Sequence, residues 1–554
     1  MQVKKNQNVL STYKKYNKVT TSTQRKISIL LVLIASVLIF LYVQNYTDAF
    51  FGNHLARMDN IVNSGTYIPG KELASDATGV YNIYGAIISI ILGLEITALF
   101  EFPLVLLGIA PLFYVLYKMV SKNYFVSSTL LVLSLITLAL FQSYLTFWTH
   151  AIGLIYLLLY LLLLHLYTQK KVKIANLILL LTIVTVAIIN MSYDMTGILA
   201  IMLASVFILT LIRNLGVGIS NNNALLSPKI SIILIIIFSG FIIYNSFIEN
   251  MFLPYMSEYF SLSRITEFIT ELISRWQGNS STVLNPLLFV QSNKLLTILN
   301  YTRYLTYLFV FISFIIIVCK KYGKSILNDD TTILLLSTII CFGGYAVLRV
   351  AIGSHSGLTY IFIPAMLCLS YIFSEASIPR KTSISICENK KSRLAIIIFN
   401  MLLICMLFSI FGYTGCYVAT MGAGLNNVEN LDSYTITSEW ISSYSTYEIA
   451  SDIFTKNMLL LTSILANDEK YYLNLNKYYL PLYLSDVEGL IYHNQQNMNS
   501  LKNIVINTNL QTPGIGDNWE RLYSWNHYLT EIDSNNWYNT IYDTKKLMIY
   551  SPSK

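Results

Sequence analysis

The chain has 554 residues, of which 55% are hydrophobic and only 12% are charged, with a mean hydropathy of +0.55 and a net charge of +8. A soluble globular protein carries about twice this charged fraction, so the composition excludes that class. Apolar runs of 16 to 22 residues recur along the chain, and each can cross a hydrocarbon core of about 30 Å. The sequence therefore predicts a polytopic α-helical membrane protein.

The N-terminal segment 1–26 is basic and is followed by the first apolar run, ISILLVLIASVLIFLYVQ (27–44). No small-residue cleavage site follows this run, so it is predicted to be a membrane span and not a signal peptide. By the positive-inside rule, residues 1–26 stay in the cytoplasm and the chain emerges outside near residue 48.

The second apolar run, YNIYGAIISIILGLEITALF (81–100), is predicted to lie on the membrane or to re-enter it. As a full span it would place the basic segments 118–123 and 169–173 outside, against the positive-inside rule. Without it, about eleven spans keep these segments and the later basic loops inside. The predicted spans are 27–44, 102–119, 124–141, 146–167, 174–190, 197–212, 230–248, 304–319, 331–348, 356–374 and 394–412.

The predicted topology divides the chain into three parts: the basic N-terminus, a membrane domain (27–412) and an outer domain (413–554). The membrane domain carries a large first outer loop (45–101) and a second long outer loop (249–303). The outer domain is polar, with 14 Asp or Glu against 8 Lys or Arg. Its runs KYYLPLYL and NTIYDTKKLMIYSP alternate like strands and TKNMLLLTSILAND is a candidate helix, which predicts an extracytoplasmic α/β or α+β domain.

The six cysteines are predicted to be free thiols, since no pair has the spacing of zinc ligands. Nucleic-acid binding has no support, because the basic residues lie on the predicted cytoplasmic loops, where they set the topology.

Ionisable residues concentrate in DAFFGNHLARMDNIVNSG (48–65), just where the chain leaves the membrane. Asp48 has the apolar neighbours Ala49 and Phe50, so partial desolvation would raise its basicity and suit a general base. The alternative is an aspartate that caps the helix starting at Ala49. His54 and Arg57 share one helical face and could bind a phosphate, or could belong to a solvated face of an amphipathic helix.

The first outer loop resembles that of the GT-C superfamily of glycosyltransferases. The likeness consists of an acid shortly after the first span, the stretch HLARMDNIVNSG, and YNIYG leading a membrane-lying helix. It is closest to the prokaryotic dolichyl-phosphate-mannose protein mannosyltransferase and aminoarabinose-transferase types. EWISS (439–443) and NTIYDTKKLMIY (539–550) also look like outer domains of such enzymes. The resemblance implies a polyprenyl-phosphate-linked sugar donor, transfer on the extracytoplasmic face, and Asp48 as catalytic base.

The next outer loop departs from the family, since QSYLTFWTHA (142–151) contains no carboxylate. The metal-dependent oligosaccharyltransferase branch has acidic ligands there and a WWDYG-like motif, which is missing from this chain. A mechanism without a metal or other cofactor is therefore favoured over a divalent metal. His150 is the candidate to take the place of the missing acidic residue of this loop, and the alternative is an interfacial histidine satisfied by water.

Two more segments at the predicted outer ends of spans carry candidate residues. Asp194, in NMSYDMTG, is either a second acid of the site or the cap of the next span. Arg349 and His355, in LRVAIGSHSG, are candidates for holding the phosphate of the lipid-linked donor, as late-span basic residues often do in the resembled family. The alternative for Arg349 is an arginine that snorkels to the interface.

The favoured interpretation is a multi-pass cell-membrane glycosyltransferase that moves a sugar from a polyprenyl-phosphate donor to a glycan, lipid or protein acceptor. Asp48 is the predicted base, and His54, Arg57, His150, Asp194, Arg349 and His355 are the predicted substrate- and phosphate-binding residues. The alternatives are a transporter or flippase of lipid-linked saccharide and a non-catalytic subunit that displays its outer domain. A transporter usually has internal repeats and ionisable groups at the membrane midplane, which this sequence does not show.

Overall fold

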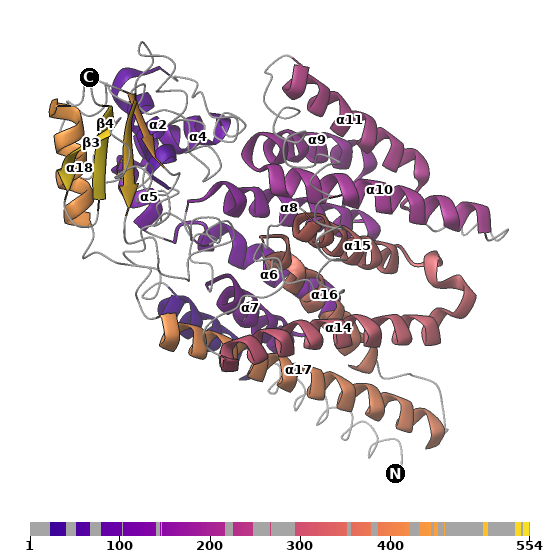
Figure 1. Ribbon diagram of the computed structural model, residues 1–554. Helices are drawn as coiled ribbons and strands as arrows, with labels where there is room; N and C mark the ends of the chain where they lie inside the picture. Colours follow the sequence, from indigo (N-terminus) through magenta and orange to yellow (C-terminus); the bar gives the residue numbers. More distant parts are fainter. Residues whose placement is uncertain are drawn as a thin grey trace.

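The computed structural model is mainly α-helical, with a small β-sheet formed by C-terminal segments (Figure 1). The residues that the structure describes are 23–39, 51–66, 79–101, 103–139, 145, 147–216, 225–247, 266, 294–351, 356–377, 386–421, 431–444, 448–451, 459, 502–507, 538–543 and 547–552.

Eight helices in the described part of the chain are long and apolar enough to cross a membrane. They are α8 (Thr149–Thr168), α9 (Ile174–Met191), α10 (Tyr193–Gly216), α11 (Pro228–Phe247), α14 (Lys294–Tyr322), α15 (Asp330–Ala351), α16 (Phe362–Ser377, preceded by the 3₁₀ turn η3, Ser356–Ile361) and α17 (Ile386–Met421). Many of their outward side chains are large and apolar, as expected of surfaces that face lipid. The chain therefore has the multi-pass helical character that its composition predicts.

Three further helices coincide with predicted spans but are shorter. They are α6 (Leu106–Ser121), α7 (Tyr124–Ala139) and the helix over residues 23–39. A helix of 16 residues, such as α6, is about 24 Å long at 1.5 Å per residue and needs a thin or locally adapted bilayer to cross it. The count of eleven spans stays a prediction.

The run 81–100 does not form one continuous helix. It is divided into α4 (Gly79–Leu92) and α5 (Ile96–Glu101) by Gly93, which has a φ of +63°. Glycine adopts such a left-handed conformation without steric cost, so the break is local to this residue. At 14 residues α4 is only about 21 Å long. It packs on α2 (Phe51–Ser64), which precedes it in the chain.

The chain reverses direction from each long helix to the next, which gives the bundle two distinct ends. One end, called the basic end here, carries Lys118, Lys170, Lys171, Lys320 and Lys321 at the helix termini and the turns between them. The opposite end, called the site end, contains the first turns of α8 and α10 and the last turn of α15. Figure 1 shows α2, α4, α5 and the sheet gathered at the site end, on the left of the view.

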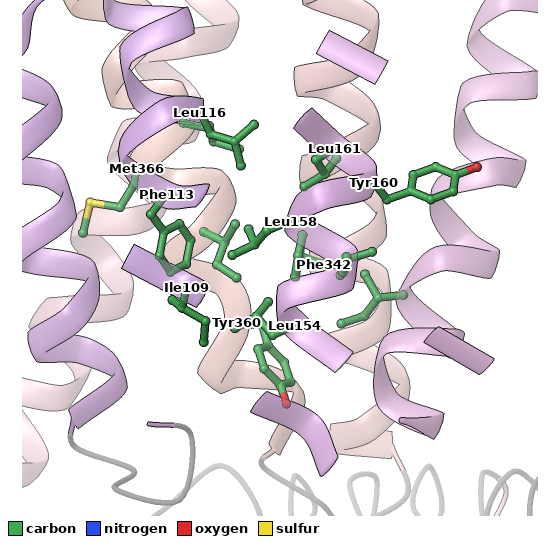
Figure 2. Packing of buried hydrophobic residues seen from close by; sticks show 14 of the residues in the cluster. Ile109, Phe113, Leu116, Leu154, Leu158, Tyr160, Leu161, Phe342, Tyr360 and Met366 are labelled. Carbon is green, nitrogen blue, oxygen red and sulfur yellow. The ribbon is translucent and has the colours of Figure 1, made fainter. Parts of the chain in front are cut away.

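The core of the bundle is built by α6, α8, α15 and α16. In Figure 2, Phe113 of α6, Leu158 of α8 and Phe342 of α15 point into one continuous apolar layer between these helices. All three side chains are buried. Because lipid is as apolar as a leucine side chain, the close packing and not water exclusion holds these helices together.

A buried ion pair stabilises the basic end. Arg213 Nη1 donates to Asp330 Oδ1 at 2.7 Å, joining the end of α10 to the start of α15. Asp330 Oδ2 accepts the backbone N–H groups of Leu225 and Leu226, at 2.7 Å and 3.2 Å. Both charged side chains are satisfied, so this carboxylate fixes the chain that enters α11.

The C-terminal segments form a four-stranded mixed sheet of order β1–β2–β4–β3. Its strands are β1 (Glu448–Ser451), β2 (Lys502–Asn507), β3 (Tyr538–Asp543) and β4 (Leu547–Pro552). Only β1 and β2 are parallel, and α18 (Leu431–Tyr444) contacts β4. The predicted strand region 539–552 corresponds to the β3–β4 hairpin. The predicted strand 477–484 lies outside the described residues, as does the predicted helix 455–468 apart from Leu459.

Two predicted boundaries differ from the observed helices. Helix α14 begins at Lys294, within the predicted outer loop 249–303, and α17 continues to Met421, beyond the predicted start of the outer domain at residue 413. For α14, the polar Arg303 is sheltered by a neighbouring helix, since it lies 4.4 Å from the ring centre of Tyr413 of α17. A hydropathy pattern ends where polar residues appear, whereas a packed helix continues through them.

Candidate functional site

The site begins with Asp194 in the first turn of α10, whose side chain has no exposed surface. The helix is capped by its neighbour and not by Asp194: Ser192 Oγ accepts the backbone N–H of Met195 at 3.4 Å. The carboxylate of Asp194 instead points at α8 and α15. Asp194 is predicted from the sequence to be either a second acid of the site or the cap of the helix. Its side chain joins a cluster of polar residues and does not cap the helix.

Three side chains from two other helices surround the Asp194 carboxylate. Tyr345 of α15 donates its hydroxyl hydrogen bond to Oδ1. Arg349 Nε lies 3.7 Å from Oδ1, and His150 Nε2 of α8 lies 3.6 Å from Oδ2. Removing a carboxylate from water is costly unless it is paired, and here the Tyr345 hydrogen bond to Oδ1 and the nearby Arg349 guanidinium provide compensation, whereas Oδ2 has no hydrogen-bond partner. Arg349 is 6% exposed, so it is held inside the protein and does not snorkel to the interface.

The sequence places these groups by helical spacing and by one glycine. Tyr345 and Arg349 are four residues apart on α15 and therefore lie on one face of the helix. Gly197 lies one turn after Asp194 on α10, and a Cβ on Gly197 would come within 2.7 Å of the Tyr345 ring. The absence of a side chain at Gly197 lets α15 approach until the tyrosine hydroxyl reaches the carboxylate.

His150 is oriented by Ser192. Its Nδ1 lies 2.9 Å from Ser192 Oγ, and a Cβ on Gly153, one turn further along α8, would come within 2.5 Å of Ser192 Cβ. Since Ser192 Oγ already accepts from Met195, its own proton is available for His150 Nδ1. The other ring nitrogen, Nε2, faces Asp194.

Helix α2 adds a second group of polar residues, His54 and Arg57. His54 Nδ1 lies 2.9 Å from Asn82 Oδ1 of α4, and its ring meets the rings of Tyr81 and Trp148 edge-on at centroid distances of 5.0 Å and 6.1 Å. Arg57, one turn along α2, is only 7% exposed. The pKa of His54 is lowered to about 4, mainly by burial; the nearby charges of Arg57 and His150 contribute to this shift, and the Asn82 hydrogen bond opposes it.

A row of ring contacts joins the two groups into one cluster at the site end. Trp148 lies 6.0 Å from His150, and the His150 ring meets Tyr193 edge-on at 4.9 Å. The guanidinium of Arg349 in turn lies 5.8 Å from the Tyr193 ring centre. Residues from α2, α4, α8, α10 and α15 therefore form a continuous surface of ionisable and aromatic groups, called the Asp194 cluster below.

Among the solved structures that are similar to this chain, one covers most of it. It is the archaeal oligosaccharyltransferase AglB from Archaeoglobus fulgidus, in complex with an inhibitory peptide and a dolichol-phosphate. The similarity has a TM-score of 0.45 and an identity of 12%, and it covers 95% of this chain and 74% of the other. A likeness of this size carries no argument about fold or activity. No family model and no curated protein matches the sequence.

The structure brings five of the seven predicted site residues together: His54, Arg57, His150, Asp194 and Arg349. The other two, Asp48 and His355, lie outside the described residues.

Sequence reasoning missed the residues that connect and orient the cluster. Tyr345, Ser192, Tyr193, Asn82 and Trp148 are uncharged, and their contacts cross from one helix to another. A signal did exist for Tyr345, since it precedes Arg349 by four residues and a tyrosine at that spacing faces the same way. No comparable signal exists for Asn82.

Metal-binding groups do not gather in the described part of the chain, where no set of three or more His, Cys, Asp or Glu could hold an ion. The carboxylate of Asp194 accepts the Tyr345 hydroxyl at Oδ1 and lies 3.6–3.7 Å from His150 and Arg349. Metal independence stays a prediction. Cys319, Cys341, Cys368 and Cys405 are free, as expected, and Cys387 and Cys416 lie where side chains are not described.

Proposed function

We propose that this protein is an integral-membrane glycosyltransferase that moves a sugar from a polyprenyl-phosphate-linked donor to an acceptor at the site end. The observation that supports this most directly is the convergence of Arg57, Arg349, His150 and Asp194 at one end of a lipid-facing bundle. A lipid-linked donor keeps its polyprenyl chain in the bilayer, so its phosphate reaches the protein at such an end.

The charge of the Asp194 cluster suits a phosphate. Among the described residues of the cluster, the guanidinium groups of Arg57 and Arg349 lie with the carboxylate of Asp194, and the His54 ring is neutral. Helices α8 and α10 both begin at this cluster, so the positive ends of their two dipoles point into it. The N-cap residue of α8 is Trp148, and its side chain accepts no hydrogen bond from the first backbone N–H groups of the helix.

In this proposal Arg57 and Arg349 stabilise the phosphate as the sugar leaves it. Negative charge then develops on the leaving group, and each donor aimed at such charge in a site of low dielectric lowers the barrier by about 3 kcal/mol. Asp194 is a positioning residue, because it touches Arg349 and His150 and fixes both side chains.

Asp48 is proposed as the general base that takes the proton of the acceptor hydroxyl. Its side chain lies outside the described residues, and the support comes from its position in the chain. Helix α2, which carries His54 and Arg57 into the cluster, begins at Phe51, three residues after Asp48. The cytoplasmic N-terminus and extracytoplasmic tail predicted from the sequence belong to the same proposal, since the site end would then face outside.

The experiment that tests the function is sugar transfer by purified protein in proteoliposomes with a radiolabelled polyprenyl-phosphate sugar and a cell-envelope extract as acceptor. Asp48→Asn should abolish transfer, whereas Asp59→Asn, which removes an acid of helix α2 that accepts a hydrogen bond from Asn63 one turn later, should keep it. Arg349→Met should reduce transfer about a hundredfold. The matched control is Lys229→Met, which removes an exposed cation at the basic end.

Two outcomes would contradict the proposal. Full transfer by Asp48→Asn protein would remove the assigned base. Movement of the lipid-linked sugar between leaflets without any transfer, measured in the same liposomes, would favour a flippase.

A further inference from the structure

The contact between His54 and Asn82 determines which nitrogen of the histidine carries the proton. His54 Nδ1 lies 2.9 Å from Asn82 Oδ1, and an amide oxygen can only accept a hydrogen bond. The Nδ1 atom is therefore the donor, which leaves the lone pair of the neutral ring on Nε2. Asn82 has no exposed surface, and the contact with His54 pairs its Oδ1, whereas its Nδ2 has no hydrogen-bond partner.

The groups around the ring favour its neutral form. Among the described residues, the charged or titratable groups that face it are Arg57 on α2, Tyr81 on α4 and His150 on α8. A positive ring would lie beside the Arg57 guanidinium, and none of these three groups is a carboxylate that could compensate for it. The ring edge is further enclosed by Tyr81 and Trp148.

A neutral ring with its lone pair on Nε2 has a chemistry different from that of its neighbours. Phosphate oxygens are acceptors and need donors, which the arginines supply and Nε2 does not. A hydroxyl group can donate to Nε2. His54 is partly exposed whereas Asn82 is fully buried, so the ring lies between the protein interior and the open side of the cluster.

We propose that His54 binds a hydroxyl group of the sugar acceptor through Nε2, and that Asn82 is the positioning residue that fixes its tautomer and ring orientation. This inference rests on the proposed function. It replaces the role predicted from the sequence, in which His54 pairs with Arg57 on the phosphate. Arg57 keeps that role.

The protonation state can be tested without sugar transfer. Diethyl pyrocarbonate acylates neutral imidazole, so labelling of the His54 peptide, followed by mass spectrometry from pH 4 to 8, reports the fraction of neutral ring. A soluble histidine peptide in the same reaction is the internal reference and loses half its labelling near its ordinary pKa of about 6.5. His54 should keep its labelling at least one pH unit lower. In Asn82→Asp, a carboxylate beside Nδ1 should move the midpoint upward by one unit or more.

The role of Nε2 is tested by a matched pair of substitutions. In His54→Gln the side-chain amide reaches the position of Nε2, whereas in His54→Asn it reaches that of Nδ1. Transfer should be lowered less than tenfold in His54→Gln and more than tenfold in His54→Asn.

Asn82 variants separate a positioning role from a structural one. Asn82→Ala should lower transfer about tenfold at every pH. Asn82→Asp should transfer sugar at alkaline pH. As the pH falls, this variant should lose transfer at a higher pH than wild type, because its His54 becomes protonated at a higher pH. A residue that is only structural would lower transfer without moving the pH profile.

Labelling of wild-type His54 that falls off near pH 6.5 would overturn the inference, and so would greater transfer by His54→Asn than by His54→Gln. If wild-type protein transfers no sugar at all, the proposed function fails and the hydroxyl-binding role fails with it. The labelling experiment then still decides whether Asn82 holds His54 as a neutral acceptor.

Discussion

Asp194 and Arg349 face each other inside the protein, with Nε 3.7 Å from Oδ1, although they belong to different helices and neither is more than 6% exposed. At this distance the pair is held mainly by electrostatic attraction, and Tyr345 provides the direct hydrogen bond to the carboxylate. Three properties of the site depend on this relationship: its charge, the orientation of Arg349 and the contact between α10 and α15.

Asp194→Asn should destabilise the protein, because it leaves Arg349 buried without its counter-ion. Breaking a buried pair by removing one partner costs about 3 kcal/mol or more. Thermal unfolding in detergent, followed by tryptophan fluorescence, should show a clear fall in the transition midpoint. The double variant Asp194→Asn with Arg349→Met should be more stable than the sum of the single changes predicts. Strict additivity would mean that the two side chains do not interact.

Gly197→Ala should displace Tyr345 from Asp194. The added Cβ would come within 2.7 Å of the ring, which is too close for an unchanged structure. Sugar transfer and thermal stability should both fall. Gly343→Ala is the control. It adds the same methyl group to the facing helix α15, where the added Cβ would meet no neighbouring side chain within 4 Å. Equal effects of the two substitutions would contradict the close approach.

The stability of the protein should fall on acidification through His54. The folded-state pKa of His54 is lowered to about 4 from an ordinary value of 6.5. Between these values the unfolded chain binds a proton that the folded chain does not, so the free energy of unfolding decreases as pH falls from 6.5 towards 4. His54→Gln removes this contribution. The difference in unfolding midpoint between wild type and His54→Gln should therefore shrink across this pH window, and a constant difference would refute the assignment.

Asp330→Asn should be strongly destabilising, whereas Glu375→Gln should be nearly neutral. Asp330 pairs with Arg213 in a buried setting and also accepts two backbone N–H groups, so its loss should cost about 3 kcal/mol. Glu375 pairs at 2.7 Å with Lys321, whose side chain is 33% exposed, and such pairs contribute about 0–1 kcal/mol. Hydrogen exchange at residues 225–230 should rise in the first variant only. Similar exchange in both would contradict the role of Asp330.

Single cysteines should report the orientation in the membrane. In a background without native cysteines, Ser64→Cys on α2 should react with an impermeant maleimide added outside intact cells, because the site end is proposed to face outwards. Lys170→Cys, at the basic end, should react only after the cells are opened. The reverse pattern would invert the topology and place sugar transfer in the cytoplasm.

Charge, not hydropathy, led to the prediction that the run 81–100 lies on the membrane or re-enters it, and this placement stays a prediction. A full span there would have reversed the sides of 118–123 and 169–173, and the observed helix does break, at Gly93. The sequence could not predict that α14 begins at Lys294, because Arg303 is sheltered there by Tyr413, more than a hundred positions later in the chain.

The sequence by itself determined the membrane character of the chain, the grouping of its lysines at one end, and which ionisable residues stand at helix ends. These are properties of hydropathy and charge, which are local in the chain. Only the tertiary structure decided that Asp194 faces Arg349 instead of capping α10, and that Asn82 contacts the ring of His54. Both depend on the close packing of separate helices, which Gly197 and Gly153 permit and which no spacing within one segment encodes.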